Sequence, residues 1–460
     1  MPAKHATPLL LGTEKISKLL MRYSIPAIIA MTAASLYNMV DSIFIGQGVG
    51  AMAISGLALT LPLVNMAAAF GSLVGVGAST LLSVKLGQKD QESANRILGN
   101  VIILNTVIGI LFSIVGLIFL DDILKFFGAS EVTLPYARDY MQIILGGNVI
   151  THLYMGLNDI LRASGYPTRA MAATLTAVFV NCVLDAVFIL VFDWGIRGAA
   201  LGTVLAQVVA LGIVVKHYLN PNSFINFRQT VFSLKSSIVK GILAIGLSPF
   251  LMNLCSSMVV ILINKSLRIY GGDIAIGAYG IVNRIAFLFV MIVMGFNQGM
   301  QPIAGYNFGA RKYDRVTGVL KYTIMCAVTV TTIGFLAAQF FPRQIALLFT
   351  NHEELITAAV QGLHIVFLLF PLVGFQMVSS NFFQSIGLAK KAIFLSLTRQ
   401  LLFLIPFLLI LPNYFGTNGV WMSIPMADGI ASVVAAILLY YQFKKFRAHK
   451  KAADNIKIKE

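Results

Sequence analysis

The sequence predicts an all-α polytopic membrane protein, with twelve transmembrane helices in two six-helix repeats around a central cavity. Only 11% of the 460 residues are charged and 58% are hydrophobic, whereas charged residues make up about a quarter of a soluble chain. About a dozen apolar runs are long enough to cross the bilayer as helices, which takes roughly 18 residues or more. In addition, the two halves of the chain resemble each other at corresponding positions.

The apolar runs define the predicted spans one by one. They begin near residues 23, 53, 96, 136, 170, 198, 239, 275, 316, 355, 389 and 420. The first run, residues 24–44, follows a basic stretch as the apolar core of a signal peptide would. It is longer than the roughly 7 to 15 residues of such a core, and it lacks a cleavage pattern of small residues. We therefore expect it to be retained as the first span.

The basic residues lie in the connections and predict the orientation of the chain. The net charge is +16, and the connections hold 26 Lys and Arg on the side of the N-terminus against 6 on the opposite side. By the positive-inside rule, this asymmetry predicts a multi-pass membrane protein with both termini in the cytoplasm. Because the charge flanks apolar runs, nucleic-acid binding is not expected.

The longest polar interval, residues 220–238, divides the chain into halves. The predicted parts are a cytoplasmic N-terminus (1–22), an N-terminal six-helix lobe (23–219), a cytoplasmic linker (220–238), a C-terminal six-helix lobe (239–441) and a basic cytoplasmic tail (442–460). A shift of 222 or 223 positions matches Pro26 with Pro249, Gly77 with Gly299, Gly165 with Gly387, Asp41 with Asn264, and Asp159 with Asn381. An even number of spans in each half makes the repeats parallel, as in transporters built for alternating access.

Several kinds of chemistry are not expected from this sequence. It contains no phosphate-binding loop of the type G-x-x-x-x-G-K-[ST], so transport energy would come from an ion or substrate gradient. The cysteines Cys182, Cys255 and Cys326 lie inside apolar runs without the spacing of metal ligands. We expect no cofactor, no resident metal ion and no enzyme active site.

Four of the eighteen acidic residues fall within predicted spans, namely Asp41, Asp159, Asp185 and Asp428. Each is a functional candidate, because an ionised carboxylate is costly inside the membrane. For Asp159 the alternative is an ion pair with Arg162 near the interface. For Asp428, between Pro425 and Gly429, a structural hydrogen bond to loosened backbone is equally compatible with the sequence.

Asp185 has the best support, because Asn181 lies four residues earlier on the same helical face. Thr203 adds a hydroxyl from the next span, and Tyr37 lies four residues before Asp41 in the first. Such oxygen ligands suit a hard monovalent cation, and two neighbouring carboxyls could equally hold a proton. The residue pattern leaves Na⁺ and H⁺ open. Pro26 removes a helical hydrogen bond and predicts a bend in the first span.

Two segments resemble signatures of a known family. They are Asp-Ser-Ile-Phe-Ile-Gly at 41–46, leading into Ala-Ile-Ser-Gly at 53–56, and Gln-Pro-Ile-Ala-Gly-Tyr-Asn-Phe-Gly-Ala at 301–310. With the repeat, the chain resembles the multidrug and toxic compound extrusion (MATE) transporters over residues 12–445, and within them the DinF-related branch. The resemblance implies an antiporter that exports amphipathic, usually cationic drugs in exchange for Na⁺ or H⁺ and thereby gives antibiotic resistance.

The resemblance also implies roles for particular residues. The cation or proton site of the branch falls on Asp41, Asn181, Asp185 and Thr203. The bending proline falls on Pro26, and the residues of the substrate cavity fall on Tyr37 and Asn158. Another branch carries acids in its C-terminal lobe, where this chain has amides instead at Asn264 and Asn381, so a C-terminal cation site is not expected.

Two other functions compete with drug export. A lipid-linked oligosaccharide flippase of related architecture would be expected to have a cationic cavity, whereas the ionisable residues of the N-terminal spans are acidic. An integral-membrane enzyme would need clusters of histidines or acids at a membrane face, and the sequence has none. The expected partners are small drugs and membrane lipid, and a monomer is the expected state.

Overall fold

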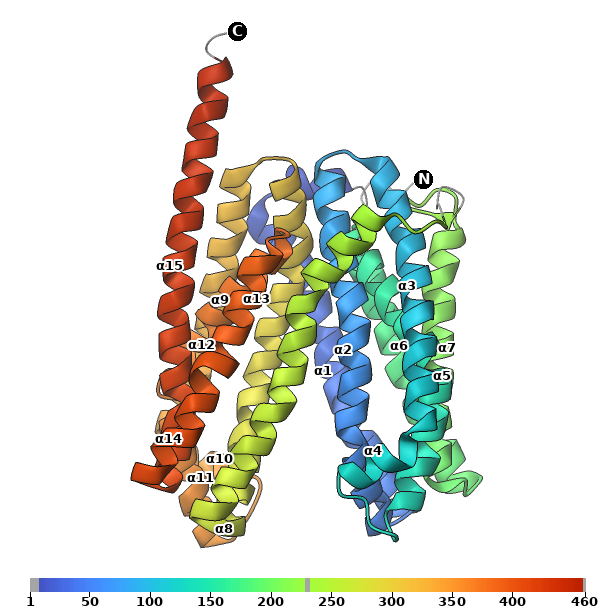
Figure 1. Ribbon diagram of the computed structural model, residues 1–460, viewed down its shortest axis with the longest axis vertical. Helices are drawn as coiled ribbons and strands as arrows, with labels where there is room; N and C mark the ends of the chain where they lie inside the picture. The colour runs from blue at the N-terminus through green and yellow to red at the C-terminus, as the bar shows by residue number, and fades with distance from the viewer. Residues whose placement is uncertain (1–7, 228–231, 458–460) are drawn as a thin grey trace. The chain divides into compact units, whose positions relative to one another are not determined.

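The computed structural model describes residues 8–227 and 232–457, and its regular structure there is helical (Figure 1). The first half contains η1 (Pro8–Gly12), α1 (Ile16–Gly48), α2 (Ala51–Gly87), α3 (Gln91–Ile118), α4 (Leu120–Phe126), α5 (Leu134–Ala163), α6 (Pro167–Asp185), the π-helical η2 (Ala186–Val191) and α7 (Gly195–Leu219). The second half contains α8 (Ser236–Gly309), α9 (Tyr313–Phe340), α10 (Pro342–Leu347), α11 (Glu353–Val366), α12 (Phe370–Ser385), α13 (Ala389–Leu397), the π-helical η4 (Thr398–Leu404), α14 (Ile405–Phe415) and α15 (Thr417–Lys457).

The helices account for all twelve predicted spans. The 74 residues of α8 are two helices that meet at Gly272, whose φ of 65° suits a residue without a side chain. The bent pair α11 and α12, with 55° between its helices, forms one span, and α13, η4 and α14 together form another. The least apolar span is α5, whose neighbours on both sides are long apolar helices. The first span begins at Ile16 rather than near residue 23, because α1 includes the basic stretch.

The chain forms two compact units, and they differ from the sequence halves at two helices. Unit 1 comprises Met1–Thr13 and Ile29–Asn253, and unit 2 comprises Glu14–Ile28 and Leu254–Glu460. Thus α1 and the first helix of α8 each contribute to both units. The boundaries fall two residues after Pro26 and four residues after Pro249, the prolines that the repeat brings into correspondence.

Close glycine contacts confirm that the repeat exists in space. In unit 1, a Cβ on Gly77 of α2 would lie 2.1 Å from the carbonyl oxygen of Ile242 and 3.1 Å from the backbone nitrogen of Gly246. In unit 2, a Cβ on Gly299 of α8 would lie 2.1 Å from Ser24 Oγ of α1. The shift of 222 positions converts Gly77 into Gly299 and Ser24 into Gly246. Equivalent helices therefore pack against each other through equivalent residues in both units.

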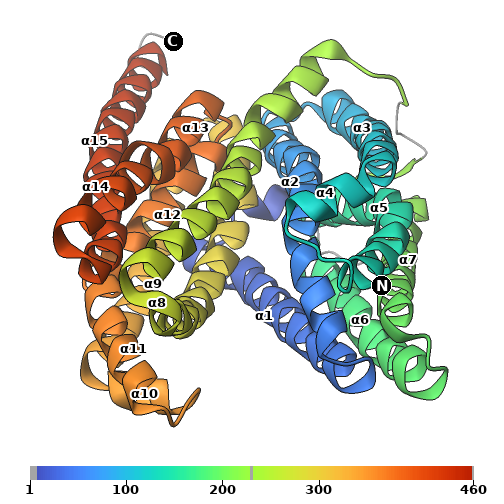
Figure 2. The ribbon, with the colours of Figure 1, turned by 60° about the horizontal axis from the view of Figure 1, so that its bottom comes forward.

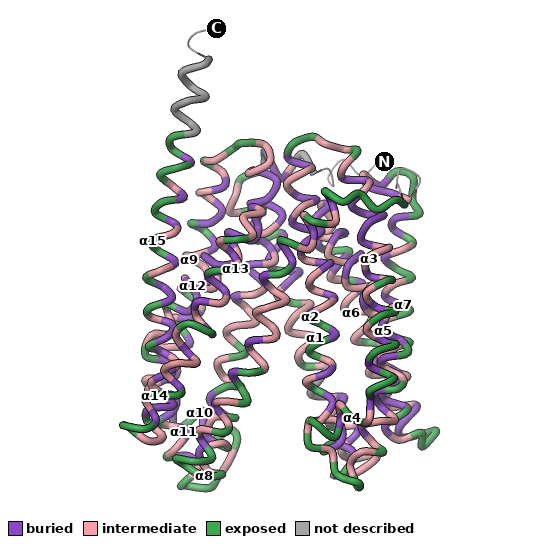
Figure 3. The backbone as a smooth tube through the Cα atoms, in the orientation of Figure 1, coloured by how far each residue is buried: buried purple, intermediate pink, exposed green. Residues whose placement is uncertain are grey.

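Apolar cores hold each unit together. In unit 1, α5 packs against α2, α3, α6 and α7, as Figure 2 shows, around buried side chains such as Tyr140 and Ile189. In unit 2, the core gathers around Trp421 and Phe367. Exposed large apolar side chains are spread along the helices (Figure 3), as expected where a helix faces hydrocarbon.

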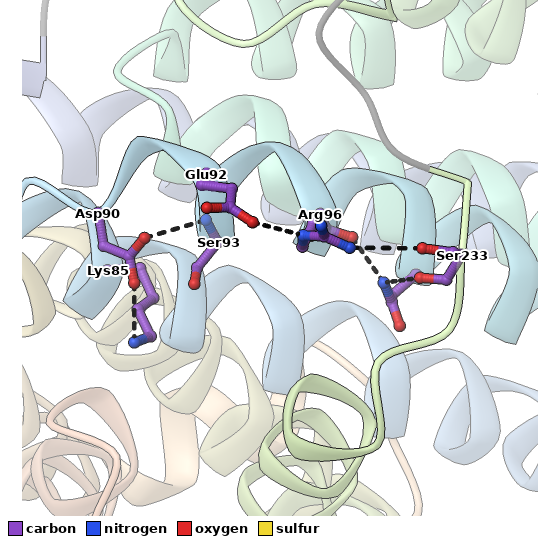
Figure 4. Close-up of polar contacts among 7 residues, drawn as sticks. Lys85, Asp90, Glu92, Ser93, Arg96 and Ser233 are labelled. Atoms are coloured by element: carbon purple, nitrogen blue, oxygen red, sulfur yellow. Dashed lines mark hydrogen bonds and ion pairs between the residues drawn. The ribbon is translucent and has the colours of Figure 1, made fainter.

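The polar interval between α7 and α8 is fastened to α3. Asn100 donates from Nδ2 to the carbonyl oxygen of Ser233 at 3.1 Å, and its Oδ1 accepts from the backbone N–H of Lys235 at 3.2 Å. At the start of α3, Asp90 accepts from the backbone N–H of Ser93 at 3.0 Å and pairs with Lys85 at 3.1 Å (Figure 4). The two bonds of Asn100 attach the described part of the linker to α3.

Candidate ion-coupling site

The four intramembrane acids fall into two classes. Asp159 forms the ion pair with Arg162 that its sequence neighbourhood predicts. Asp428 on α15 is paired with Arg399 on η4, a partner 29 residues away in the chain. No ion pair among residues 8–227 and 232–457 involves Asp41 or Asp185. The structure thus separates two neutralised carboxylates from two carboxyls without a basic partner.

Asp41 and Asp185 lie together inside unit 1. Asp41 comes from α1 and Asp185 from the end of α6, and their carboxyl groups are close enough to share a hydrogen bond. Their exposed fractions are 6% and 0%. Within the described structure, Asp41 Oδ1 and Asp185 Oδ2 have no hydrogen-bond partner. Two adjacent negative charges repel strongly where the dielectric constant is low, so a proton or a cation between these oxygens would stabilise the pair.

Polar side chains from four helices surround the two acids. Asn181 Nδ2 donates to Asp185 Oδ1 at 2.8 Å. The hydroxyls of Tyr37 and Thr203 lie 3.1 Å apart and form a hydrogen bond. The hydroxyl of Tyr140 on α5 also reaches Thr203 and interacts with both acids. The structure therefore brings together five residues predicted from the sequence, Tyr37, Asp41, Asn181, Asp185 and Thr203, and adds Tyr140.

The backbone of α7 shapes the site at Gly202. A Cβ there would lie 2.5 Å from Asp185 Oδ1 and 3.3 Å from Asn181 Nδ2, so only glycine leaves room for these side chains. The signal for this contact is in the sequence, because small residues recur every fourth position at Gly198, Gly202, Ala206 and Ala210. Tyr140 had no such signal, since nothing nearby distinguishes it from Tyr136.

Asp185 also marks a change of helix type. The α-helical hydrogen bonding of α6 ends at this residue, and the π-helical η2 follows directly. Single π turns inside helices are frequent at functional sites. The corresponding fifth span of unit 2 contains the π-helical η4, which carries the paired Arg399. An unpaired acid thus directly precedes the π segment of one unit, and a neutralised base lies within the π segment of the other.

Asn158 belongs to a second polar cluster. The hydroxyls of Tyr154 and Thr174 lie 2.9 Å apart, and Asn158 Nδ2 donates to Thr174 Oγ1 at 3.4 Å. Thr174 precedes Asp185 by eleven residues on α6, which corresponds to about 16 Å along the helix. Of the two residues predicted to line the substrate cavity, Tyr37 therefore lies beside the acid pair, whereas Asn158 lies in the separate cluster with Tyr154 and Thr174.

The remaining predicted positions lie elsewhere. Pro26 is buried inside α1, which continues through it as a helix. In unit 2, Asn381 Nδ2 donates to the carbonyl oxygen of Met377 on its own helix at 3.1 Å. Among the described residues, no group of three or more His, Cys, Asp or Glu side chains is placed to hold a metal ion. The acid pair with its amide and hydroxyls offers oxygen ligands, which suit H⁺ or Na⁺.

Both repeats of the chain match a known protein family. The model of the MatE family matches residues 26–187 and 245–410. The chain belongs to the MatE family. The matched segments lie in both repeats. They include Tyr37, Asp41, Tyr140, Asn181 and Asp185, whereas Gly202 and Thr203 of α7 come after the end of the first matched segment. The resemblance to MATE transporters read from the sequence is thereby confirmed.

Relatives and solved structures support the assignment across the chain. Over 427 residues the chain is 27% identical to the multidrug export protein MepA of Staphylococcus haemolyticus (strain JCSC1435), covering 93% of this chain and 94% of that protein. A crystal structure of MATE in the bent conformation is similar with a TM-score of 0.91 and 26% identity, covering 97% of this chain and 99% of that one. The outward-facing conformation of a multidrug resistance MATE family transporter is similar with a TM-score of 0.89 and 26% identity, covering 96% and 99%.

Proposed function

We propose that this MatE-family chain is a secondary active multidrug antiporter that exports amphipathic cationic drugs in exchange for H⁺ or Na⁺. The observation that carries the proposal is the buried pair Asp41 and Asp185, which has no lysine or arginine partner in the described structure. The substrate class follows from the relatives, because the similar staphylococcal proteins are named multidrug export proteins.

Coupling requires a site whose charge changes during transport. With H⁺ or Na⁺ bound, the acid pair carries at most one net negative charge and its oxygens are satisfied. With the ion released, two buried negative charges repel each other, which favours a different packing of α1, α6 and α7. The hydroxyls of Tyr37, Tyr140 and Thr203 would change position together with the acids, because they belong to the same polar group. Ion binding and helix packing are thereby linked.

The drug would be held by apolar surface with a few polar groups. A cationic substrate is attracted by unpaired carboxylates. The cluster of Tyr154, Asn158 and Thr174 on α5 and α6, about 16 Å along α6 from Asp185, offers hydrogen bonds. Asn158 Oδ1 is buried without a partner in the described structure, so it can accept a hydrogen bond from a ligand. Competition between drug and ion for the same negative charge would make the exchange obligatory.

The oligosaccharide flippase has weaker support. Recognition of a pyrophosphate would call for an available buried arginine or lysine. Arg399 of unit 2 is half-buried, and Asp428 neutralises it. For an enzyme that depends on a metal ion, the described residues offer no group of three or more His, Cys, Asp or Glu side chains placed to hold one. Transport across the bacterial plasma membrane, with both termini in the cytoplasm and no cofactor, remains the proposal that fits the charge distribution.

Dye export from everted vesicles tests this function. When a proton gradient and a Na⁺ gradient are imposed separately, vesicles containing the chain should accumulate ethidium under one of the two gradients and not under the other. Vesicles without the chain are the control. Equal accumulation in vesicles with and without the chain under both gradients would contradict the proposal.

A further inference from the structure

An apolar groove runs along the eleventh span, away from the acid pair. It has a volume of about 430 Å³ and is lined by Lys390, Ile393, Phe394, Leu397, Leu401 and Leu402 of α13 and η4. Its volume lies in the range of small-molecule sites, roughly 300 to 1,000 Å³. Phe394, Leu401 and Leu402 are 47%, 37% and 55% exposed. Because these residues lie on a membrane span, hydrocarbon rather than water is expected to fill the groove.

The residues that line the groove extend over about one leaflet of the bilayer. From Lys390 to Leu402 the chain advances twelve residues, which would be about 18 Å in an α-helix and is less here, because Thr398–Leu404 is π-helical. One leaflet contributes about 15 Å to the hydrocarbon core. Since Lys390 is at one end and the leucines are at the other, a lipid with its headgroup at the lysine would place an acyl chain along the apolar residues.

Basic side chains gather at the lysine end. Lys391, the next residue, donates to Gln442 Oε1 of α15 at 2.6 Å and lies over the ring of Phe383 at 5.3 Å from its centroid. Lys445 of α15 is close enough to Lys391 for the two ammonium groups to repel each other. The ion pairs found within residues 8–227 and 232–457 include none of these three lysines. This end of the groove therefore has uncompensated positive charge.

We propose that the groove along α13 and η4 binds an anionic phospholipid, with one acyl chain against Phe394, Leu397 and Leu401 and the phosphate at Lys390, beside Lys391 and Lys445. A neutral or zwitterionic lipid would fill the groove equally well but would leave the lysines uncompensated. Each lysine near a lipid surface contributes to the attraction of anionic headgroups. With the cytoplasmic orientation proposed above, the bound lipid lies in the cytoplasmic leaflet.

The test uses the purified full-length chain and a phosphatidylglycerol with a photoreactive acyl chain. Illumination should attach the probe to residues 390–402, and unlabelled phosphatidylglycerol should compete at lower concentration than phosphatidylcholine. Lys390→Gln should raise the phosphatidylglycerol concentration needed for competition by about fivefold. Lys390→Arg should keep the wild-type concentration, because the positive charge is retained. Lys321→Gln, which removes an exposed lysine of α9 outside the groove, should also leave the concentration unchanged.

Three results would overturn the proposal. Attachment of the probe outside residues 390–402 would mean that the groove does not hold the lipid. Equal competition by phosphatidylcholine would mean that the groove accepts lipid without recognising charge. An unchanged competition curve for Lys390→Gln, with the wild-type elution profile in gel filtration, would remove the assigned role of the lysine.

Discussion

Asp185 Oδ1 lies 2.5 Å from the position that a Cβ on Gly202 would occupy. The carboxyl group of α6 therefore rests against the bare backbone of α7, and Asn181 Nδ2 lies 3.3 Å from the same position. Any side chain on Gly202 would have to displace the group that we assign to ion coupling. The position of the acid pair thus depends on a residue that has no functional group of its own.

Gly202→Ala should lower the rate of dye export about tenfold or more, because the added methyl group displaces Asp185 from Asp41. Overpacking of this kind costs about 1–3 kcal/mol of stability, so export must be compared at equal amounts of folded protein. Gly212→Ala is the matched control, since it lies on the same helix with no atom within 4 Å of the added Cβ. Equal export by both variants would show that the close contact at Gly202 is not needed.

The two tyrosine hydroxyls at Thr203 should act as a pair. Tyr37→Phe or Tyr140→Phe alone should retain a large part of export, because Thr203 keeps one hydroxyl partner. The double variant should lose more than the sum of the single losses, with a coupling energy of about 0.5–1.5 kcal/mol in the apparent affinity for the coupling ion. Tyr414→Phe, at a residue 78% exposed, is the control. Additive losses would mean that the hydroxyls act separately.

Asp90, which caps the N-terminus of α3, should make a pH-dependent contribution to the stability of the fold. Slight burial of Asp90 opposes ionisation, but the hydrogen bonds from Ser93 and the charge of Lys85 outweigh it and hold the pKa of Asp90 below its usual value. This contribution is present above the unfolded pKa and is lost as the pH falls through the lower folded pKa. Asp90→Ala should cost about 1 kcal/mol at pH 7 and progressively less below about pH 4. Melting curves of Asp90→Ala and of the cap-preserving Asp90→Asn check this, and a loss that grows in acid would contradict it.

The charge distribution predicts the sidedness of the chain. In a background without the three native cysteines, Lys444→Cys on α15 should resist impermeant thiol reagents in whole cells. Glu131→Cys, in the exposed connection between α4 and α5, should be labelled from outside. Both positions should react after the cells are opened. The opposite labelling pattern would reverse the proposed topology.

Much of the fold was readable from the sequence, because transmembrane helices are determined by apolar length. Each predicted span corresponds to a helix or to a run of consecutive helical segments, and the two helices of α8 follow each other directly at Gly272. The sequence did not predict that α1 and α8 each contribute residues to both units, since this depends on tertiary contacts such as that of Gly299 with Ser24. The prolines near both unit boundaries were the available local signal.

The candidate site was predictable where its residues share a helix. The spacing of four residues in Tyr37 and Asp41, and in Asn181 and Asp185, places each pair on one face. Tyr140 and the pairing of Asp428 with Arg399 were not predictable in this way, because they join helices that are distant in the chain. Asn158 was assigned through family resemblance, and its separation from the acid pair became visible only in the structure.

The central claim is that a site in the N-terminal repeat gains and loses charge, while its counterpart in the other repeat cannot. Asp41 corresponds to Asn264, and amides neither titrate nor balance a cation. The most direct measurement is the initial rate of uphill ethidium export in everted vesicles for Asp41→Asn and Asn264→Ala, at matched protein levels and under the gradient that drives the wild type. We predict that Asp41→Asn abolishes uphill export and that Asn264→Ala retains a substantial fraction, losing hydrogen bonds or packing of about 1 kcal/mol. An active Asp41→Asn variant, or an Asn264→Ala variant that is equally inactive, would contradict the account.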